Sequence, residues 1–242
     1  MAWSYGSQHQ LRRWILERPE EITGDLLDRN KELREWALRI EWLSPAPDTR
    51  VELRDGGWTE MGLSADSPQQ AGWWPPGGGV WDAIARVHGP NGEVGGIFVE
   101  AKGRPGELTA GGMKATRKES VLKIKSALAD VQACLDVTTS NEWLRACYQP
   151  ANRLALLWYA RKKCDPPAPV WLVSLYFLGE HYPKASTTEI GPETEEVWQP
   201  IIEALHERMG LPERPHALST WWIESFVPAL EPPSGRPART RT

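Results

Sequence analysis

The chain has no long apolar segment. Its amino terminus, MAWSYGSQHQLRRW, lacks the apolar core of a secretory signal peptide. No later stretch approaches the roughly 20 apolar residues that a membrane-spanning helix needs. These absences argue against a secreted or membrane protein, and we expect a soluble protein of the cytoplasm.

Cysteine is scarce. The three cysteines, Cys134, Cys147 and Cys164, are odd in number and widely separated. They therefore predict neither a disulfide framework nor a CxxC metal site. Because free cysteine is usually buried, we interpret all three as reduced, structural residues.

The motifs of several enzyme classes are missing. The five histidines show no HExxH pairing and there is no GxSxG sequence, which argues against zinc and serine hydrolases. Residues 106–114 (GELTAGGMK) break the GxxxxGK[ST] spacing of a phosphate-binding loop. We predict only a flexible loop there.

Charge is present but unevenly distributed. The net charge of −4 counts against a general nucleic-acid binder. Residues 102–125, however, include seven basic residues and only two acidic ones. This region is either a positive binding surface or a solvated loop and helix face, which is the commoner fate of a charge run.

The 242 residues, 40% of them hydrophobic, suit a single domain with a real core. We predict that this domain covers residues 1–230, with helical additions at its amino and carboxyl ends. Residues 231–242 are rich in Pro and Arg and contain no large apolar side chain. They predict a disordered tail.

Apolar periodicity predicts the main elements. Helices are expected at 30–43, 120–137, 151–163 and 194–209, with Asn30 capping the first and Gly210 ending the last. Strands are expected at 50–54, 79–88, 96–102 and 169–178. The last strand is almost wholly apolar, so it should be buried on both faces.

Turn chemistry fixes the register of a hairpin. Residues 89–92 (GPNG) suit a type I turn, with Gly92 as the left-handed residue of a three-residue loop. Such a loop centres the hairpin on Asn91, so residues whose numbers sum to 182 face each other. Asp82 then lies across from Glu100, with Cβ atoms about 5 Å apart.

Lys102 follows Glu100 on the same face of the strand. Glu100-Ala101-Lys102 is the one place in the chain where an acid stands two residues before a lysine. Two opposed carboxylates repel unless a cation, a proton or Lys102 compensates them. Hard oxygen ligands at this spacing suit Mg²⁺ or Mn²⁺.

The opposite face of the hairpin is expected to be the core. It carries Trp81, Ala83, Ala85, Val87, Ile97, Val99 and Ala101. Because Ile84 and Phe98 share the acidic face, that face should also be partly covered. Trp73 and Trp74, in a Pro/Gly-rich loop, either stack on bases or, as is commoner, pack down to pin the loop.

Asp82, Glu100 and Lys102 resemble the active site of the PD-(D/E)xK nuclease superfamily, over roughly residues 30–180. That resemblance implies an α/β, restriction-endonuclease-like αβββαβ core with a central mixed sheet flanked by helices. It implies that Asp82 and Glu100 bind the metal, while Lys102 positions or activates the attacking water and stabilises developing charge. The segments WDAIARV, VEAK and YQPANRLA are also similar to a group of uncharacterised bacterial proteins.

The match has departures and open positions. Trp81 stands where the family name has proline. A further acid that some members carry is matched by Glu35, Glu41 or Glu52. A glutamine near the site in some members is matched by Gln132, although a plain helix-surface residue is the more ordinary interpretation.

We therefore predict a metal-dependent nuclease, a hydrolase of phosphodiester bonds that acts on DNA in preference to RNA. The alternative is a non-catalytic binding module that keeps this fold as a scaffold for a protein or nucleic-acid partner. The acidic net charge favours the module. A third interpretation is a solvated edge hairpin in which Lys102 neutralises two surface acids.

Overall fold

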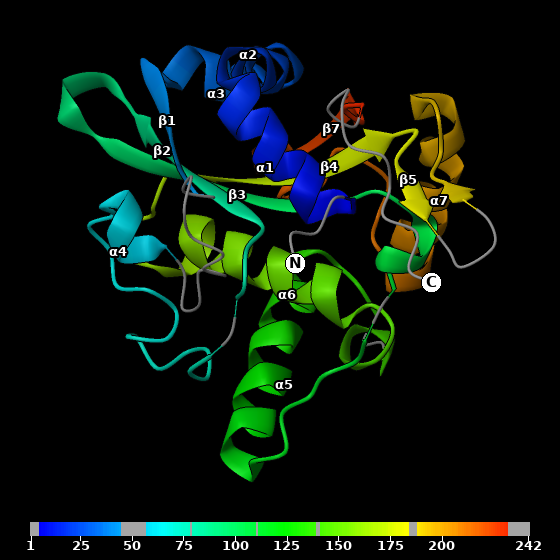
Figure 1. The fold of residues 1–242 in the computed structure, drawn as a ribbon. Helices are drawn as coiled ribbons and strands as arrows, with labels where there is room; N and C mark the ends of the chain where they lie inside the picture. The colour runs from blue at the N-terminus through cyan, green and yellow to red at the C-terminus, as the bar shows by residue number, and fades with distance from the viewer. Residues whose placement is uncertain are drawn as a thin grey trace.

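A five-stranded mixed sheet forms the centre of the computed structural model (Figure 1), which describes residues 5–44, 57–77, 79–109, 111–138, 141–183 and 188–231. The strands lie in the order β1-β2-β3-β4-β7. Their bounds are β1 Arg39–Ser44, β2 Ala83–His88, β3 Val94–Lys102, β4 Val170–Leu178 and β7 Trp222–Pro228.

The sheet has an antiparallel half and a parallel half. Strands β1, β2 and β3 pair antiparallel, whereas β3, β4 and β7 pair parallel. The parallel connections require long crossovers, and helices supply them. A separate two-stranded sheet consists of β5 (His181–Pro183) and β6 (Thr188–Ile190).

Helices cover both faces of the sheet (Figure 1). One face packs against α1 (Ser7–Glu17), α2 (Pro19–Arg29) and α3 (Lys31–Trp36). The other packs against α4 (Trp58–Met61), α5 (Lys118–Cys134), α6 (Tyr148–Trp158) and α7 (Glu195–Met209). A π-helical turn, Tyr159–Lys163, continues α6, and short 3₁₀ turns occupy Pro90–Gly92, Pro105–Glu107, Asn141–Leu144 and Ser219–Trp221.

Both faces of the β2–β3 hairpin are buried. Ala83, Ala85, Val87, Ile97, Val99 and Ala101 face α1–α3, as predicted. Ile84 and Phe98 lie on the other face and are also buried. The prediction that Trp81 shares the face of Ala83 and Val99 is wrong. Its ring packs on Phe98, on the other face, with centroids 4.5 Å apart. A bend at Asp82 separates Trp81 from β2, which begins at Ala83, so the alternation of faces along β2 does not extend to Trp81.

Six predicted elements are confirmed. The helices expected at 120–137, 151–163 and 194–209 correspond to α5, to α6 with its π-helical turn, and to α7, and the strands expected at 79–88, 96–102 and 169–178 correspond to β2, β3 and β4. Gly210 ends α7 with a left-handed φ of 69°. Strand β4 is buried along almost its whole length. Cys147 and Cys164 are buried, Cys134 is half-buried, and all three are free.

The prediction of one helix over 30–43 is wrong in its second half. The cap is right, since Asn30 Oδ1 accepts a hydrogen bond from Leu33 N at 2.8 Å, but α3 stops well before Leu43. The chain then extends into β1, where Ile40 and Leu43 pack on opposite faces of the sheet. Pairing with β2 supplies the backbone hydrogen bonds, so tertiary context overrides the helical spacing.

Six elements were not predicted individually: α1, α2, α4, β5, β6 and β7. Helices α1 and α2 fall within the expected amino-terminal addition, whereas the carboxyl-terminal addition contains a fifth strand, β7. The predicted strand at 50–54 and the predicted tail beyond Glu231 lie outside the described residues. Within the described ranges, no helix combines the length and the apolar character needed to cross a bilayer.

Candidate active site

The β2–β3 hairpin brings Asp82 close to Glu100. The paired residues Ala83 and Val99, like every other pair of this hairpin, have numbers that sum to 182. The pairing ends at Ala83 and Val99. Asp82 lies at a bend just before β2, where its N–H donates to the Val99 carbonyl at 3.1 Å and its Oδ2 accepts from Ala101 N at 2.8 Å. The predicted turn type is wrong, because Asn91 itself has a left-handed φ of 58°.

Two cations neutralise Glu100. Its Oε1 accepts a hydrogen bond from Lys102 Nζ at 2.6 Å. Its Oε2 accepts from Arg153 Nε at 2.9 Å and Nη2 at 2.7 Å. Burial alone raises the pKa of Glu100, but Arg153 and Lys102 outweigh it and hold that pKa below its usual value. Glu100 is therefore ionised at neutral pH.

Asp82 has no cation bonded to it among the described residues. Its Oδ1 accepts from Gln8 Nε2 at 2.9 Å and its Oδ2 from Ala101 N at 2.8 Å, and both donors are neutral. Burial and then the negative charge of Glu100 raise the pKa of Asp82 to about 6. The charge of Lys102 only partly offsets this effect. Asp82 is thus the place where a proton or a cation relieves the site.

Lys102 lies at the edge of a small cavity of about 40 Å³. Its Nζ also lies 3.4 Å from Gln149 Oε1. The polar lining is Glu100, Lys102, Gln149, Arg153, Ser174 and Tyr176, and the apolar lining is Leu108, Pro150, Leu172, Leu205 and Trp222. The lysine amine is therefore held among hydrogen-bonding groups and shielded by apolar walls.

Polar residues continue at the same level across the parallel half of the sheet. Glu100 pairs with Ser174 on β4, and Ser174 pairs with Glu224 on β7. Ser174 Oγ accepts from Trp222 Nε1 at 2.9 Å, and Glu224 Oε1 pairs with Arg214 Nη2 at 3.1 Å. Sequence reasoning missed Ser174 and Glu224, since only the strand register reveals this alignment.

Arg153 and Gln149 are also contributions that sequence reasoning missed. They stand four residues apart on α6, so they share one side of that helix. Arg153 additionally donates to the Val80 carbonyl at 2.5 Å and lies 4.5 Å from the Trp81 ring centroid. Both belong to the segment YQPANRLA. Their spacing of four residues on a largely apolar helix is the sequence feature that could have pointed to them.

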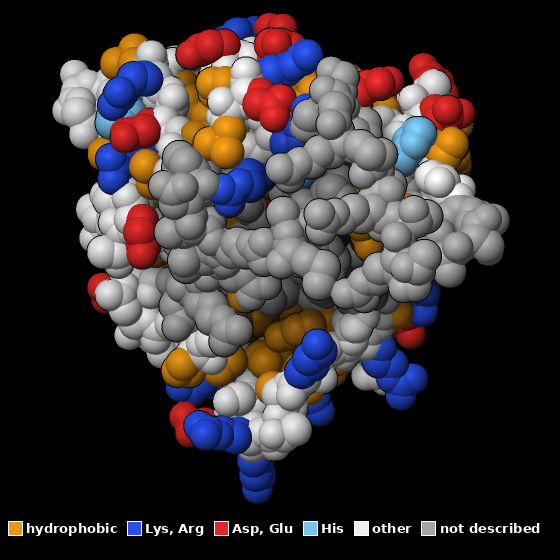
Figure 2. Space-filling model, viewed as in Figure 1, with side chains coloured by type: hydrophobic (Ala, Val, Ile, Leu, Met, Phe, Trp, Pro, Cys, Tyr) orange, Lys and Arg blue, Asp and Glu red, His pale blue; other side chains and the backbone are white. Residues whose placement is uncertain are grey.

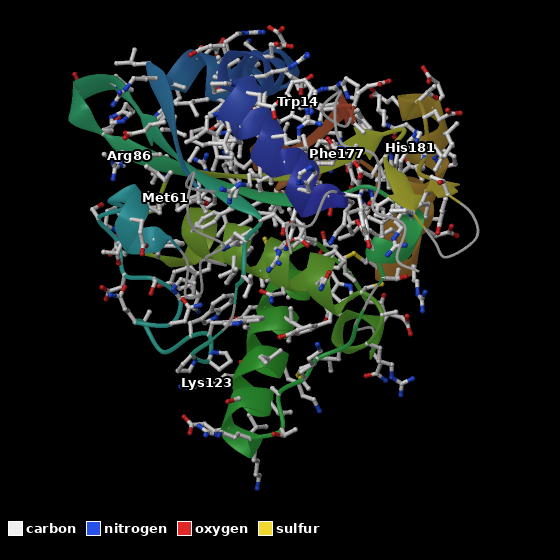
Figure 3. All side chains as sticks on the ribbon, in the orientation of Figure 1. Trp14, Met61, Arg86, Lys123, Phe177 and His181 are labelled. Atoms are coloured by element: carbon white, nitrogen blue, oxygen red, sulfur yellow. The ribbon has the colours of Figure 1, made fainter. Side chains whose placement is uncertain are left out.

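The other acids considered do not join the site. Glu35 forms an exposed pair with Lys31. Glu41 binds His88 and Arg86 toward the turn end of the hairpin, where Figure 3 labels Arg86. Glu52 lies outside the described residues.

Gln132 and the tryptophan pair are packing residues. Gln132 is buried on α5, which corrects the helix-surface interpretation, and no hydrogen bond within the described chain connects it to the site. Trp74 is 1% exposed. Trp73 stacks on Tyr159 with centroids 5.0 Å apart. The two tryptophans therefore pin their loop, as the commoner interpretation has it.

The donor set suits a hard divalent cation such as Mg²⁺ or Mn²⁺ better than Zn²⁺. Asp82 and Glu100 supply carboxylate oxygens, and no cluster of three or more His, Cys, Asp or Glu side chains suited to a metal occurs in the part of the chain that is described. Comparisons with protein-family models, curated proteins and solved structures each returned no match. The geometry and chemistry of the site therefore carry the functional assignment.

Proposed function

We propose that the protein is a divalent-metal-dependent nuclease of the PD-(D/E)xK type that hydrolyses phosphodiester bonds, with DNA as the preferred substrate. The observation that carries this proposal is the hairpin: Asp82 accepts from Ala101 N at 2.8 Å, between Glu100 and Lys102, and Lys102 contacts Glu100 at 2.6 Å. Apart from the short helix α4 between β1 and β2, the order α3, β1, β2, β3, α5–α6, β4 agrees with the αβββαβ order that the resemblance implies.

Asp82 and Glu100 are the residues that would hold Mg²⁺ or Mn²⁺. The raised pKa of Asp82 supports this assignment, because a carboxylate crowded by burial and by a second carboxylate gains most from a bound cation. When bound, such an ion polarises a phosphate and lowers the pKa of water. Without it, a proton on Asp82 relieves the same repulsion.

Lys102 supplies the second chemical function. Its amine is fixed by Glu100 and faces Gln149 across the small cavity. A positive donor in this position hydrogen-bonds an attacking water and stabilises negative charge that develops on phosphate oxygens. Arg153 holds the Glu100 carboxylate in place through two hydrogen bonds.

A second function, a non-catalytic binding module, is favoured by one observation. Lys102 and Arg153 together occupy both oxygens of Glu100, so this carboxylate is satisfied without any metal. A buried acid between two cations is also what a purely structural ion-pair network contains. Divalent-cation binding separates the two functions, because the module needs none.

The experiment combines calorimetric Mn²⁺ titration with a cleavage assay on single- and double-stranded DNA and RNA. We expect Asp82→Ala and Glu100→Ala to lose cation affinity and cleavage together. Lys102→Ala should keep cation affinity, or raise it, while cleavage falls by about 10²- to 10³-fold, by analogy with loss of a single transition-state donor. Lys31→Ala, which removes an exposed lysine paired only with Glu35, is the matched control and should change neither property.

Two outcomes contradict the nuclease. One is cleavage by Lys102→Ala at the parental rate. The other is Mn²⁺ binding that none of the three site variants alters. Either outcome would favour the non-catalytic binding module over the nuclease.

A further inference from the structure

The protruding end of α5 carries uncompensated positive charge. Five exposed cationic residues gather here. Lys118 and Lys125 lie on α5, Lys114 and Arg117 lie on the segment that leads to it, and Arg145 lies on the turn that this segment contacts. We name these five residues the basic arm. Among the residues that the structure describes, none of the five forms an ion pair.

The acids near the basic arm are engaged with other cations: Glu119 with Lys123 at 3.3 Å, Asp130 with Lys163 at 3.8 Å, and Glu142 with Arg208 at 2.6 Å. Lys and Arg side chains accordingly gather over the lower end of the molecule in Figure 2, and Figure 3 labels Lys123 on the same part of α5. Five unpaired cations in one place are notable on a chain whose net charge is −4.

The position of these charges works against helix stability. Arg117 is the residue before the first turn of α5 and Lys118 is its first residue. The amino end of a helix has a positive partial charge, so cations there are locally unfavourable. A bound anion removes this conflict, whereas water leaves it in place.

The helix also spaces the charges along a line. Lys118 and Lys125 are seven residues apart, which is two helical turns, so they share one exposed face and stand about 10 Å apart along the axis. A rod of cations at this spacing matches a polyanion with several charges in a row. A single small anion cannot contact both ends.

The basic arm begins beside the candidate active site. Met113 N donates to the Leu144 carbonyl at 3.0 Å, which ties the segment before α5 to the turn before α6. Arg145 follows on that turn, four residues before Gln149. Gln149 in turn contacts Lys102. The segment before α5 is thereby linked, through the turn that carries Arg145, to the residue that contacts Lys102.

We propose that the basic arm binds the phosphate backbone of a nucleic-acid strand whose scissile bond lies at Lys102. The choice of nucleic acid, rather than another polyanion, rests on the proposed nuclease function. Because the contacts are to phosphates, the arm contributes affinity and orientation and carries no sequence preference.

The test measures binding by fluorescence anisotropy in a chelator, where metal-dependent cleavage does not occur. The probes are a short labelled DNA duplex and the single strand of the same sequence, titrated over a range of salt. The arm variant combines Lys114→Gln, Arg117→Gln and Lys118→Gln. The control variant removes three exposed cations on the opposite side of the sheet: Arg18→Gln, Lys31→Gln and Arg34→Gln.

We expect the arm variant to reduce the slope of log affinity against log salt by about 2.7 on the duplex or about 2.1 on the single strand. At about 0.1 M salt this corresponds to a loss of affinity on the order of 10²-fold. The control variant should bind like the parent protein. A charge-conserving variant that combines Lys114→Arg, Arg117→Lys and Lys118→Arg should restore the parental slope, since phosphate contacts need only charge.

Three results overturn the inference: equal binding by the arm variant and the parent protein, equal losses in the arm and control variants, or binding of the parent to anionic lipid vesicles with no binding to either oligonucleotide. The binding assay is independent of catalysis. A parent protein that binds through the arm but never cleaves with Mn²⁺ contradicts the nuclease and supports the arm.

Discussion

Asp82 contributes to the dependence of protein stability on pH. Its pKa is about 6 in the folded state and 3.8 for the unperturbed side chain. Between these values the folded state keeps a proton that the unfolded chain has released, so stability falls as pH rises through this window and stays lower above it. Glu100 acts in the opposite direction, because its lowered pKa adds stability that is lost as pH falls.

Asp82→Asn should therefore stabilise the protein at neutral pH while removing cation binding. An asparagine keeps the oxygen that accepts from Ala101 N and cannot ionise. We expect a gain of about 1 to 3 kcal/mol in the free energy of unfolding at pH 7 that shrinks toward zero at pH 4. Thermal melts at both pH values measure it. A gain of the same size at both pH values would show that charge is not its origin.

Arg153 allows a second test at this scale. Arg153→Gln leaves Glu100 buried with Lys102 as its one remaining bonded cation, at an expected cost of about 2 to 4 kcal/mol at pH 7. If the site binds metal, Mn²⁺ should replace the positive charge that the variant has lost. Added Mn²⁺ should therefore raise the melting temperature of Arg153→Gln by more than it raises that of the parent protein.

Arg161→Gln is the matched control for Arg153→Gln. Arg161 is equally buried, with 10% side-chain exposure, but pairs with Glu32. This variant should lose stability without any change in its response to Mn²⁺. If Arg153→Gln responds to Mn²⁺ no better than Arg161→Gln does, the carboxylates do not bind a cation in exchange for the arginine.

At the scale of elements, Asn30 is a junction between helices and sheet. It caps α3 through Leu33 N, and its Nδ2 donates to the Thr220 carbonyl at 2.8 Å, just before β7. Asn30→Ala should cost about 2 kcal/mol, since it removes both bonds. Asn30→Asp retains the cap and loses the second bond, so its loss should be intermediate in urea denaturation. Equal losses would assign the whole effect to Thr220.

Periodicity in the sequence predicted α5, α6, α7 and β4 because each buries a stripe or a run of its own residues. It failed for Arg39–Ser44 and Trp222–Pro228, whose strand conformation depends on partners elsewhere in the chain. The site divides in the same way. Asp82, Glu100 and Lys102 belong to one hairpin and follow from turn chemistry, whereas Arg153 and Glu224 reach the same level only through the crossovers.

At the scale of the whole molecule, helix α1 anchors the end of the described chain at Leu230 and Glu231. Gln10 hydrogen-bonds both the N–H and the carbonyl of Leu230, and Arg13 donates to the carbonyls of Leu230 and Glu231. Deleting residues 232–242 should leave the melting temperature within about 2 °C of the parent value. Deleting 229–242 should lower it by several degrees, because α1 loses its partner. A large loss from the shorter deletion would show that the tail contributes to the fold.

The chain connectivity orders the assembly of the site in time. Asp82, Glu100 and Lys102 meet when a local hairpin closes, which requires only a short loop. Arg153 lies 53 residues beyond Glu100 and can dock only after the crossover to β4 is made, and such long-range closure is slow. The newly formed hairpin therefore holds two crowded carboxylates and a single lysine, which contacts Glu100. Early folding should accordingly be faster when Asp82 is protonated, and the arrival of α6 completes the charge balance of the native sheet.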